Sequence, residues 1–276
     1  MPGQNELGGE LKGWNVASQA VTIPRMSKKK PSLSSVIISI WIWIEILVVT
    51  ILVSSAGVLF IFPFSFFFDA RREWMHNVSR TWASWIIFFC PLWKIQTHNS
   101  HRLDKKKTYV IVANHQNIAD IFVVLAAIPA HFKFMAKEEL FKVPFMGWSM
   151  RLSGYIPVNR ASRESGRDAF LLAREWIEKG VNVLFFPEGT RSTDGVIKDF
   201  KQGAFKLAQE MNVEILPVVL DGTLEAIPKH SRIFQPCPNF QVSFCEPLSA
   251  KGNVLELKDK IHVLMTEELA RLRGRK

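Results

Sequence analysis

The chain has 276 residues, enough for one large domain or for one domain with an attached segment. Hydrophobic residues make up 48% and charged residues 22%, with 21 Phe and 9 Trp, which excludes an intrinsically disordered protein. Lys and Arg outnumber Asp and Glu by 35 to 25, so the net charge of +10 favours an anionic or phosphorylated partner. The basic residues are dispersed and form no nucleic-acid motif, so we expect no nucleic-acid partner.

The cysteines indicate neither a disulfide framework nor a zinc site. Cys90, Cys237 and Cys245 are odd in number and widely spaced, which fits a reducing compartment. His98 and His101 lie three residues apart without a second group of ligands, and we interpret them as loop histidines. The sequence therefore predicts no metal site.

Residues 1–35 are polar and basic and show no apolar periodicity, so we expect a tail. Residues 36–68 then carry one charge, that of Glu45, in 33 positions. A single membrane span needs about 20 apolar residues, and the apolar region of a signal peptide has only about 7 to 15. The stretch is too long for a signal and too short for two full spans, so we expect it to remain in the mature protein.

A second apolar stretch, 82–93, follows the polar residues 71–80, and its tryptophans suit the headgroup zone of a bilayer. We therefore predict a helical membrane-attachment region over 36–97, either a two-helix hairpin or a tilted helix with an interfacial helix. One transmembrane helix followed by a core helix is the alternative. Basic residues flank both ends of 36–68 and give no clean orientation. We expect a membrane location with the active site on the cytoplasmic face.

In the remainder, 98–276, short apolar runs alternate with amphipathic stretches of about 10 to 16 residues, a pattern typical of a sheet covered by helices. We predict an α/β domain with a mixed, mostly parallel sheet flanked by helices. The expected strands are 109–113, 132–136, 155–158, 181–186, 215–220 and 240–244. We expect a last amphipathic helix over 254–272. Four basic residues lie at its end, Arg271, Arg273, Arg275 and Lys276, and their charges either are solvated or contact anionic headgroups.

The first group of residues that can carry chemistry has the pattern Asn-His-x4-Asp, where a predicted strand ends and a helix begins. If the turn brings Asp120 back to His115, the carboxylate fixes the imidazole tautomer and stabilises the imidazolium that forms when the ring takes a proton. Alternatively, Asp120 is a first-turn acid that accepts from free helix N–H groups. The spacing alone leaves both interpretations open.

A second group, Phe-Pro-Glu-Gly-Thr-Arg-Ser, follows the expected strand 181–186. Gly189 allows a tight turn, Thr190 and Ser192 supply hydroxyl groups, and the planar guanidinium of Arg191 matches phosphate oxygens. This pattern indicates an anion-binding turn. The alternative is a polar turn with an exposed arginine.

Two more cations, Lys137 and Arg160, stand at the ends of predicted strands. The ends of parallel strands gather at one edge of a sheet, so these cations can converge there with Arg191 and His115. A base beside several cations suits a phosphorylated alcohol as substrate.

Four blocks occur in this order: Asn-His-x4-Asp, Gly-Tyr-Ile-Pro-Val-Asn-Arg, Phe-Pro-Glu-Gly-Thr-Arg-Ser and Leu-Pro-Val-Val. Over about residues 80–245 the chain resembles the glycerolipid acyltransferase family, and most closely its 1-acylglycerol-3-phosphate acyltransferases. The resemblance implies that His115 deprotonates the sn-2 hydroxyl of lysophosphatidic acid while Asp120 holds the ring. The hydroxyl would attack an acyl thioester of coenzyme A or acyl carrier protein, giving phosphatidic acid at the lipid bilayer.

The same resemblance implies which residues bind the acceptor phosphate or shape its site: Lys137, Arg160, Glu188, Gly189, Thr190 and Arg191. It implies no tightly bound cofactor, since the thioester is a co-substrate. Asn117 departs from the family, where serine is common at this position. Two alternatives remain, namely another acceptor such as glycerol 3-phosphate or a different lysophospholipid, and a membrane lipid-binding protein without turnover.

Overall fold

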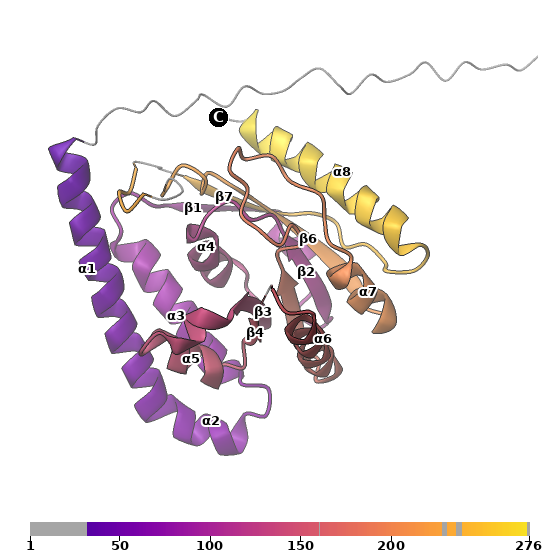
Figure 1. Ribbon diagram of the computed structural model, residues 1–276, viewed down its shortest axis with the longest axis horizontal. Coiled ribbons are helices and arrows are strands. Elements are labelled where there is room, and N and C mark those ends of the chain that lie inside the picture. Colours follow the sequence, from indigo (N-terminus) through magenta and orange to yellow (C-terminus); the bar gives the residue numbers. More distant parts are fainter. Residues whose placement is uncertain (1–31, 160, 228–230, 236–238, 275–276) are drawn as a thin grey trace, which may run out of the picture.

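The computed structural model describes four stretches of the chain, residues 32–159, 161–227, 231–235 and 239–274. Most of the expected tail and Arg160 lie outside them. A sheet separates two groups of helices, and a long N-terminal helix runs along one side of the molecule (Figure 1). The predicted mixed, mostly parallel sheet with flanking helices and a preceding helical segment is confirmed.

The sheet has seven strands in the order β1-β7-β6-β2-β5-β3-β4. Every neighbouring pair is parallel except β6 and β7, which are antiparallel. The strands are β1 (Ile95–His98), β2 (Tyr109–Ala113), β3 (Phe132–Lys137), β4 (Ile156–Val158), β5 (Asn182–Phe185), β6 (Glu214–Asp221) and β7 (Phe240–Phe244). The six expected strands are present, whereas β1 was not predicted, and His98 ends this strand instead of lying in a loop.

Helices cover both faces of the sheet, and its central strands are therefore buried on both sides. In β2, Tyr109, Ile111 and Ala113 belong to one apolar core, whereas Val110 and Val112 belong to the other. This alternation follows from the two-residue period of a strand. Burial of both faces is typical of parallel sheets, whose crossover helices pack on either side.

The helices are α1 (Leu33–Ala56), a π-helical turn η1 (Gly57–Ile61), α2 (Phe62–Phe68), α3 (Glu73–Phe89), α4 (Ala119–Ala127), α5 (Met146–Leu152), α6 (Arg163–Glu178), α7 (Gly203–Glu210) and α8 (Val254–Arg273). Two short 3-10 turns are η2 (Ser100–Arg102) and η3 (Glu138–Lys142). Side-chain caps fix three helix starts, with Ser32, Ser162 and Asn253 accepting from backbone N–H groups of the first turn.

The N-terminal helices pack as a hairpin in which α3 returns alongside α1 (Figure 1). The Trp82 Nε1–H donates to Thr50 Oγ1 across the pair at 2.9 Å, and Gly57 leaves room for Val78. The run Leu33–Phe68 is the one helix of the described residues that is long and apolar enough to cross a membrane. Its 36 residues would extend roughly 54 Å, well beyond the about 30 Å of a bilayer core.

A buried lysine ties the turn of this hairpin to the sheet. Lys133 in β3 is fully buried, and its ammonium group donates to the carbonyl oxygens of Ser153 at 2.6 Å and Arg72 at 3.3 Å. The same Nζ lies 4.7 Å from the ring centroid of Trp176. Burial lowers the pKa of the Lys133 ammonium to about 7. Because Arg72 closes the α2–α3 turn, this contact joins the helical hairpin to the α/β part of the molecule.

We predict that Lys133→Met flattens the dependence of unfolding free energy on pH. The unfolded lysine holds its proton up to about pH 10, whereas the folded one releases it near pH 7, so stability of the wild type rises with pH between these values. For one proton the slope reaches about 1.4 kcal/mol per pH unit. Chemical denaturation in detergent at pH 7 to 9 measures it.

Lys179→Met is the matched control, because the exposed ammonium of Lys179 lies 4.8 Å from the same Trp176 ring. It should leave the slope unchanged. Equal slopes in wild type and Lys133→Met would contradict the prediction.

Candidate active site

The first motif lies at the carboxyl end of β2, in the middle of the sheet. The side chain of Asn114 fastens it to β6, since its Nδ2 donates to the Leu220 carbonyl at 2.8 Å and its Oδ1 accepts from the Leu220 N–H at 2.7 Å. β2 is flanked by β5 and β6, so His115 emerges between the ends of two neighbouring strands. The strand order therefore places the histidine at a fixed point of the sheet edge.

His115 and Asp120 meet as the spacing suggested. The distance between His115 Nδ1 and Asp120 Oδ2 is 2.7 Å, and the carboxylate is fully buried. The same oxygen accepts from the N–H groups of Gln116 at 2.6 Å and Asn117 at 2.8 Å. Both interpretations of Asp120 thus hold together: it orients the imidazole and it accepts from the turn that precedes α4.

This arrangement leaves the other ring nitrogen for chemistry. A carboxylate oxygen can only accept, so Nδ1 carries a proton and Nε2 has a free lone pair. The ring stacks on Phe186 with centroids 4.3 Å apart, and 11% of the His115 side chain is exposed. Asp120 therefore holds the Nδ1 edge of the imidazole and Phe186 covers one face, while a small part of the side chain stays exposed.

The second motif is bonded directly to the first. Glu188 Oε1 accepts from the His115 N–H at 2.8 Å, Oε2 accepts from the Lys198 N–H at 3.1 Å, and the Ser192 N–H donates to the His115 carbonyl at 2.7 Å. Burial raises the pKa of the Glu188 carboxyl, and the two N–H groups oppose that shift. Of the two roles that the resemblance implied, binding phosphate or shaping its site, these contacts fit the second.

The turn after Glu188 presents the expected cation. Gly189 has a φ of 71°, in the left-handed region that favours glycine, and the flexible end of the Lys201 side chain packs against it. Thr190 and Arg191 are exposed, and the Lys198 ammonium donates to the Arg191 carbonyl at 3.3 Å. The arginine side chain therefore extends from a braced turn beside His115.

Lys137 stands at the carboxyl end of β3, and its exposed ammonium pairs with Glu139 at 3.0 Å. β3 neighbours β5, which precedes the Glu188 turn, so Lys137 lies at the same edge of the sheet. Arg160 lies outside the described residues. In the part of the chain that the structure describes, no group of three or more His, Cys, Asp and Glu residues could hold a metal ion.

Asn117, the departure from the expected serine, has contacts that a hydroxyl group could not all make. Its Nδ2 donates to the Ile227 carbonyl at 2.7 Å, and its Oδ1 accepts from the Ala119 N–H at 3.2 Å. It thereby joins the start of α4 to the segment that follows β6. Neither this contact nor the stacking of Phe186 on His115 could be predicted from the sequence.

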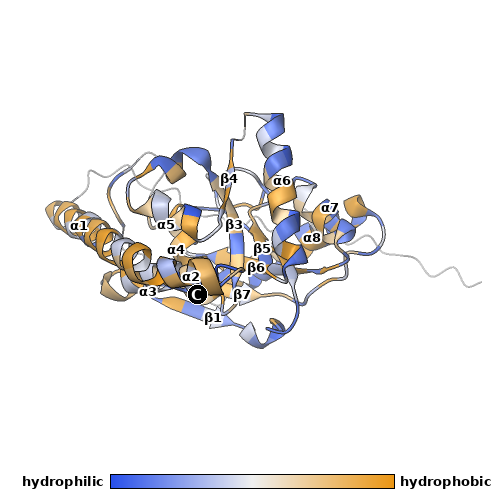
Figure 2. Cartoon of the chain, turned by 90° about the horizontal axis from the view of Figure 1, so that it is seen from below, coloured by the Kyte–Doolittle hydropathy of each residue, from blue (hydrophilic) through white to orange (hydrophobic). Residues whose placement is uncertain are grey.

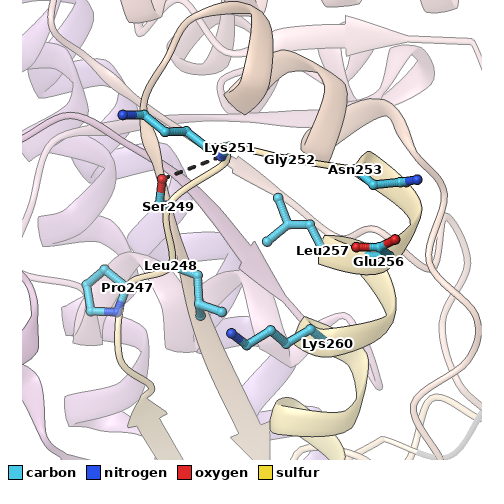
Figure 3. Close-up of a pocket in the computed structure, with 9 residues that line it drawn as sticks. All are labelled: Pro247, Leu248, Ser249, Lys251, Gly252, Asn253, Glu256, Leu257 and Lys260. Atoms are coloured by element: carbon cyan, nitrogen blue, oxygen red, sulfur yellow. Dashed lines mark hydrogen bonds between the residues drawn. The ribbon is translucent and has the colours of Figure 1, made fainter.

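A separate hollow lies between the β7–α8 connection and the first turns of α8 (Figure 3). It is lined by residues 247–249 and 251–253 together with Glu256, Leu257 and Lys260. Because β7 is antiparallel to β6, Leu248 pairs with Ile215 near the start of β6. The hollow is therefore at the opposite edge of the sheet from His115 and takes no part in this site.

A histidine held by a buried carboxylate, at the edge of a mostly parallel sheet and beside an arginine turn, defines a site that can deprotonate the hydroxyl of a phosphorylated acceptor. A protein-family model described as Acyltransferase matches residues 94–221. The chain is 36% identical over 204 residues to a chloroplastic 1-acyl-sn-glycerol-3-phosphate acyltransferase from Arabidopsis thaliana, covering 72% of this chain and 56% of the relative.

Two further matches agree with these. A 1-acyl-sn-glycerol-3-phosphate acyltransferase from Saccharomyces cerevisiae is 35% identical over 172 residues, which cover 59% of this chain and 56% of the relative. The crystal structure of the 1-acyl-sn-glycerophosphate acyltransferase from Thermotoga maritima superposes with a TM-score of 0.69 at 26% identity, covering 88% of this chain and 98% of that one. The chain belongs to the glycerolipid acyltransferase family, and it spans little more than half the length of these curated relatives.

We predict that Glu188→Gln lowers turnover at this site about 10- to 100-fold. The amide keeps one acceptor oxygen but turns an NH2 group toward the N–H of His115 or Lys198, and a hydrogen bond to a charged group contributes about 1.5–3 kcal/mol. Steady-state kinetics measure the change. Glu210→Gln, an exposed carboxylate at the end of α7, is the control, and an equal loss in both variants would refute a positioning role for Glu188.

Proposed function

We propose that this protein transfers a fatty acyl group from a thioester to the sn-2 hydroxyl of lysophosphatidic acid and so makes phosphatidic acid. The observation that carries the proposal is the 2.7 Å contact of His115 Nδ1 with buried Asp120, which leaves Nε2 as a base beside the Arg191 turn. The names of the relatives support the same acceptor. The donor is acyl-coenzyme A or acyl-acyl carrier protein, and no tightly bound cofactor takes part.

In this mechanism His115 Nε2 takes the proton of the acceptor hydroxyl as the oxygen attacks the thioester carbonyl. Asp120 stabilises the imidazolium that forms. The tetrahedral intermediate then collapses, the carbon–sulfur bond breaks, and the imidazolium returns the proton to the departing thiolate. Arg191, Lys137 and Arg160 are proposed to hold the acceptor phosphate. Direct transfer of this kind needs no acyl-enzyme.

The membrane attachment of the enzyme rests on an apolar face of the N-terminal hairpin. Helices α1 and α2 are predominantly hydrophobic along their length and α3 is hydrophobic in its last turns, whereas α6 is mixed (Figure 2). Exposed members of this face are Leu33, Ile37, Ile40, Trp41, Ile44, Leu47, Leu52, Leu59, Phe60, Phe64, Phe66, Phe67, Phe68, Trp74, Trp85, Phe88 and Phe89. A lipid bilayer covers such a surface at a gain of about 1.5–3 kcal/mol for each large side chain.

The acceptor and the product are both lipids, so attachment spares the extraction of an acyl chain from the bilayer at about 0.8 kcal/mol per CH2. Basic residues flank the apolar helix on both sides. These residues set no orientation, and we propose the cytoplasmic face for the active site because the coenzyme A or acyl carrier protein thioester is available there.

We predict that Asp120→Asn lowers kcat about a thousandfold or more and that His115→Gln abolishes turnover. The amide can offer its NH2 group to Nδ1 and favour the wrong imidazole tautomer, a change with large effects in His–Asp pairs elsewhere. Purified protein is given lysophosphatidic acid with acyl-coenzyme A or acyl-acyl carrier protein, and the products are identified by mass spectrometry. Retained turnover in His115→Gln would remove the base from the mechanism.

The same assay separates the alternatives. Acylation of glycerol 3-phosphate or of another lysophospholipid, in preference to lysophosphatidic acid, would change the acceptor and keep the site. Binding of lysophosphatidic acid without transfer from either donor would favour a lipid-binding protein.

We predict that replacing Phe66, Phe67 and Phe68 with serine lowers binding to phosphatidylcholine–phosphatidylglycerol vesicles at least about a hundredfold, from the burial of three large side chains. Vesicle flotation measures the bound fraction. The control replaces three exposed apolar residues outside the hairpin, Leu171, Leu172 and Val263, with serine. Equal loss in both triple variants would refute the role of the hairpin.

A further inference from the structure

The last turn of α8 sends an arginine into the structure instead of into solvent. Arg273 Nε donates to Asp221 Oδ1 at 3.1 Å, and its Nη2 donates to the Gly195 carbonyl at 2.9 Å. Only 18% of its side chain is exposed, against 5% for Asp221. The sequence suggested that the basic residues at this end are solvated or contact headgroups. This is wrong for Arg273, whereas Arg271 pairs with Glu268 and keeps 35% of its side chain exposed. Arg275 and Lys276 lie outside the described residues.

The two partners of Arg273 lie on either side of the strand that carries His115. Asp221 ends β6 and follows Leu220, whose backbone is bonded to the Asn114 side chain. Gly195 belongs to the segment after β5, three residues beyond the Ser192 N–H that binds the His115 carbonyl. Because β2 lies between β5 and β6, the guanidinium joins both flanks of the His115 turn.

A second residue of α8 holds the same segment. His262 Nε2 donates to the Ile197 carbonyl at 3.2 Å, and its ring lies edge-on to Phe200 with centroids 5.0 Å apart. Between them, the Lys198 N–H is held by Glu188. Residues 192–200 are thus fixed from the His115 side by Glu188 and from the other side by α8.

This segment determines where Arg191 stands. The side-chain ammonium of Lys198 donates to the Arg191 carbonyl, so displacement of 192–200 moves the backbone of the arginine turn. A guanidinium that forms charge-assisted bonds to two segments fixes their separation better than a single-point cation, because its donors have a planar, rigid geometry. The family match ends at Asp221 and leaves α8 outside it.

We propose that Arg273 is a positioning residue for the acceptor phosphate: through Gly195 and Asp221 it holds the Arg191 turn in place, so the affinity for lysophosphatidic acid depends on α8. The inference rests on the proposed function for its substrate. It assigns to α8 a part in acceptor recognition although none of its residues touches the acceptor.

The test compares Arg273→Gln, Arg273→Lys and Arg271→Gln, a matched variant in the same turn whose partner is Glu268. For Arg273→Gln the KM for lysophosphatidic acid rises about tenfold, with a smaller change in kcat and no change in the KM for the thioester, since the loss is one of acceptor binding. Arg273→Lys keeps the charge but lacks the planar set of donors, and it gives an intermediate KM for lysophosphatidic acid. Arg271→Gln stays within about twofold of wild type.

Amide hydrogen exchange supplies a readout that does not require turnover. In Arg273→Gln, exchange within 192–200 accelerates while β2 stays protected, and Arg271→Gln leaves 192–200 unchanged. Unaltered exchange and KM in Arg273→Gln would overturn the proposal, and so would equal acceleration throughout the sheet, which denotes general destabilisation. If the wild-type protein did not acylate lysophosphatidic acid but the exchange pattern were as expected, the proposed substrate would be refuted, and the role of Arg273 in holding residues 192–200 would stand.

Discussion

One buried carboxylate oxygen organises the loop that follows β2. Asp120 Oδ2 accepts from the imidazole Nδ1 and from two successive backbone N–H groups, all within 2.8 Å. The N–H groups hold the carboxylate in the turn, and the carboxylate holds the ring, so a displacement of the loop also moves the imidazole. Glu188 repeats the principle on the other side, with one oxygen on the His115 N–H and the other on the Lys198 N–H.

The sheet makes this local arrangement possible because three neighbouring strands, β5, β2 and β6, end at one edge. Each contributes a different part: β2 the imidazole of His115, β5 the turn with Arg191, and β6 the backbone that receives the Asn114 side chain. Helix α8, which is distant in sequence from all three, closes the arrangement through Arg273. The site is therefore a property of the strand order and not of any single motif.

The sequence predicts those parts of the molecule whose physical signal is local. The six expected strands are short runs made mostly of apolar residues, whereas β1 has the sequence Ile-Gln-Thr-His on a partly exposed edge and lacks that signal. The pairing of His115 with Asp120 follows from spacing across a turn. The contacts of Glu188 and Arg273 do not, because a side chain that bonds a backbone 73 or 78 residues away leaves no periodic pattern.

The contact of Asn117 with Ile227 belongs to a longer chain of bonds. On α1, Ser39 Oγ accepts from the Phe234 N–H at 2.9 Å, and the Gln235 N–H donates to the Ala226 carbonyl at 3.0 Å. The apolar N-terminal helix and the loop bearing the imidazole thus grip the same piece of backbone from opposite ends. Loss of the Asn117 amide would therefore release this segment on the side of the imidazole and leave Ser39 to hold it on the side of the first helix.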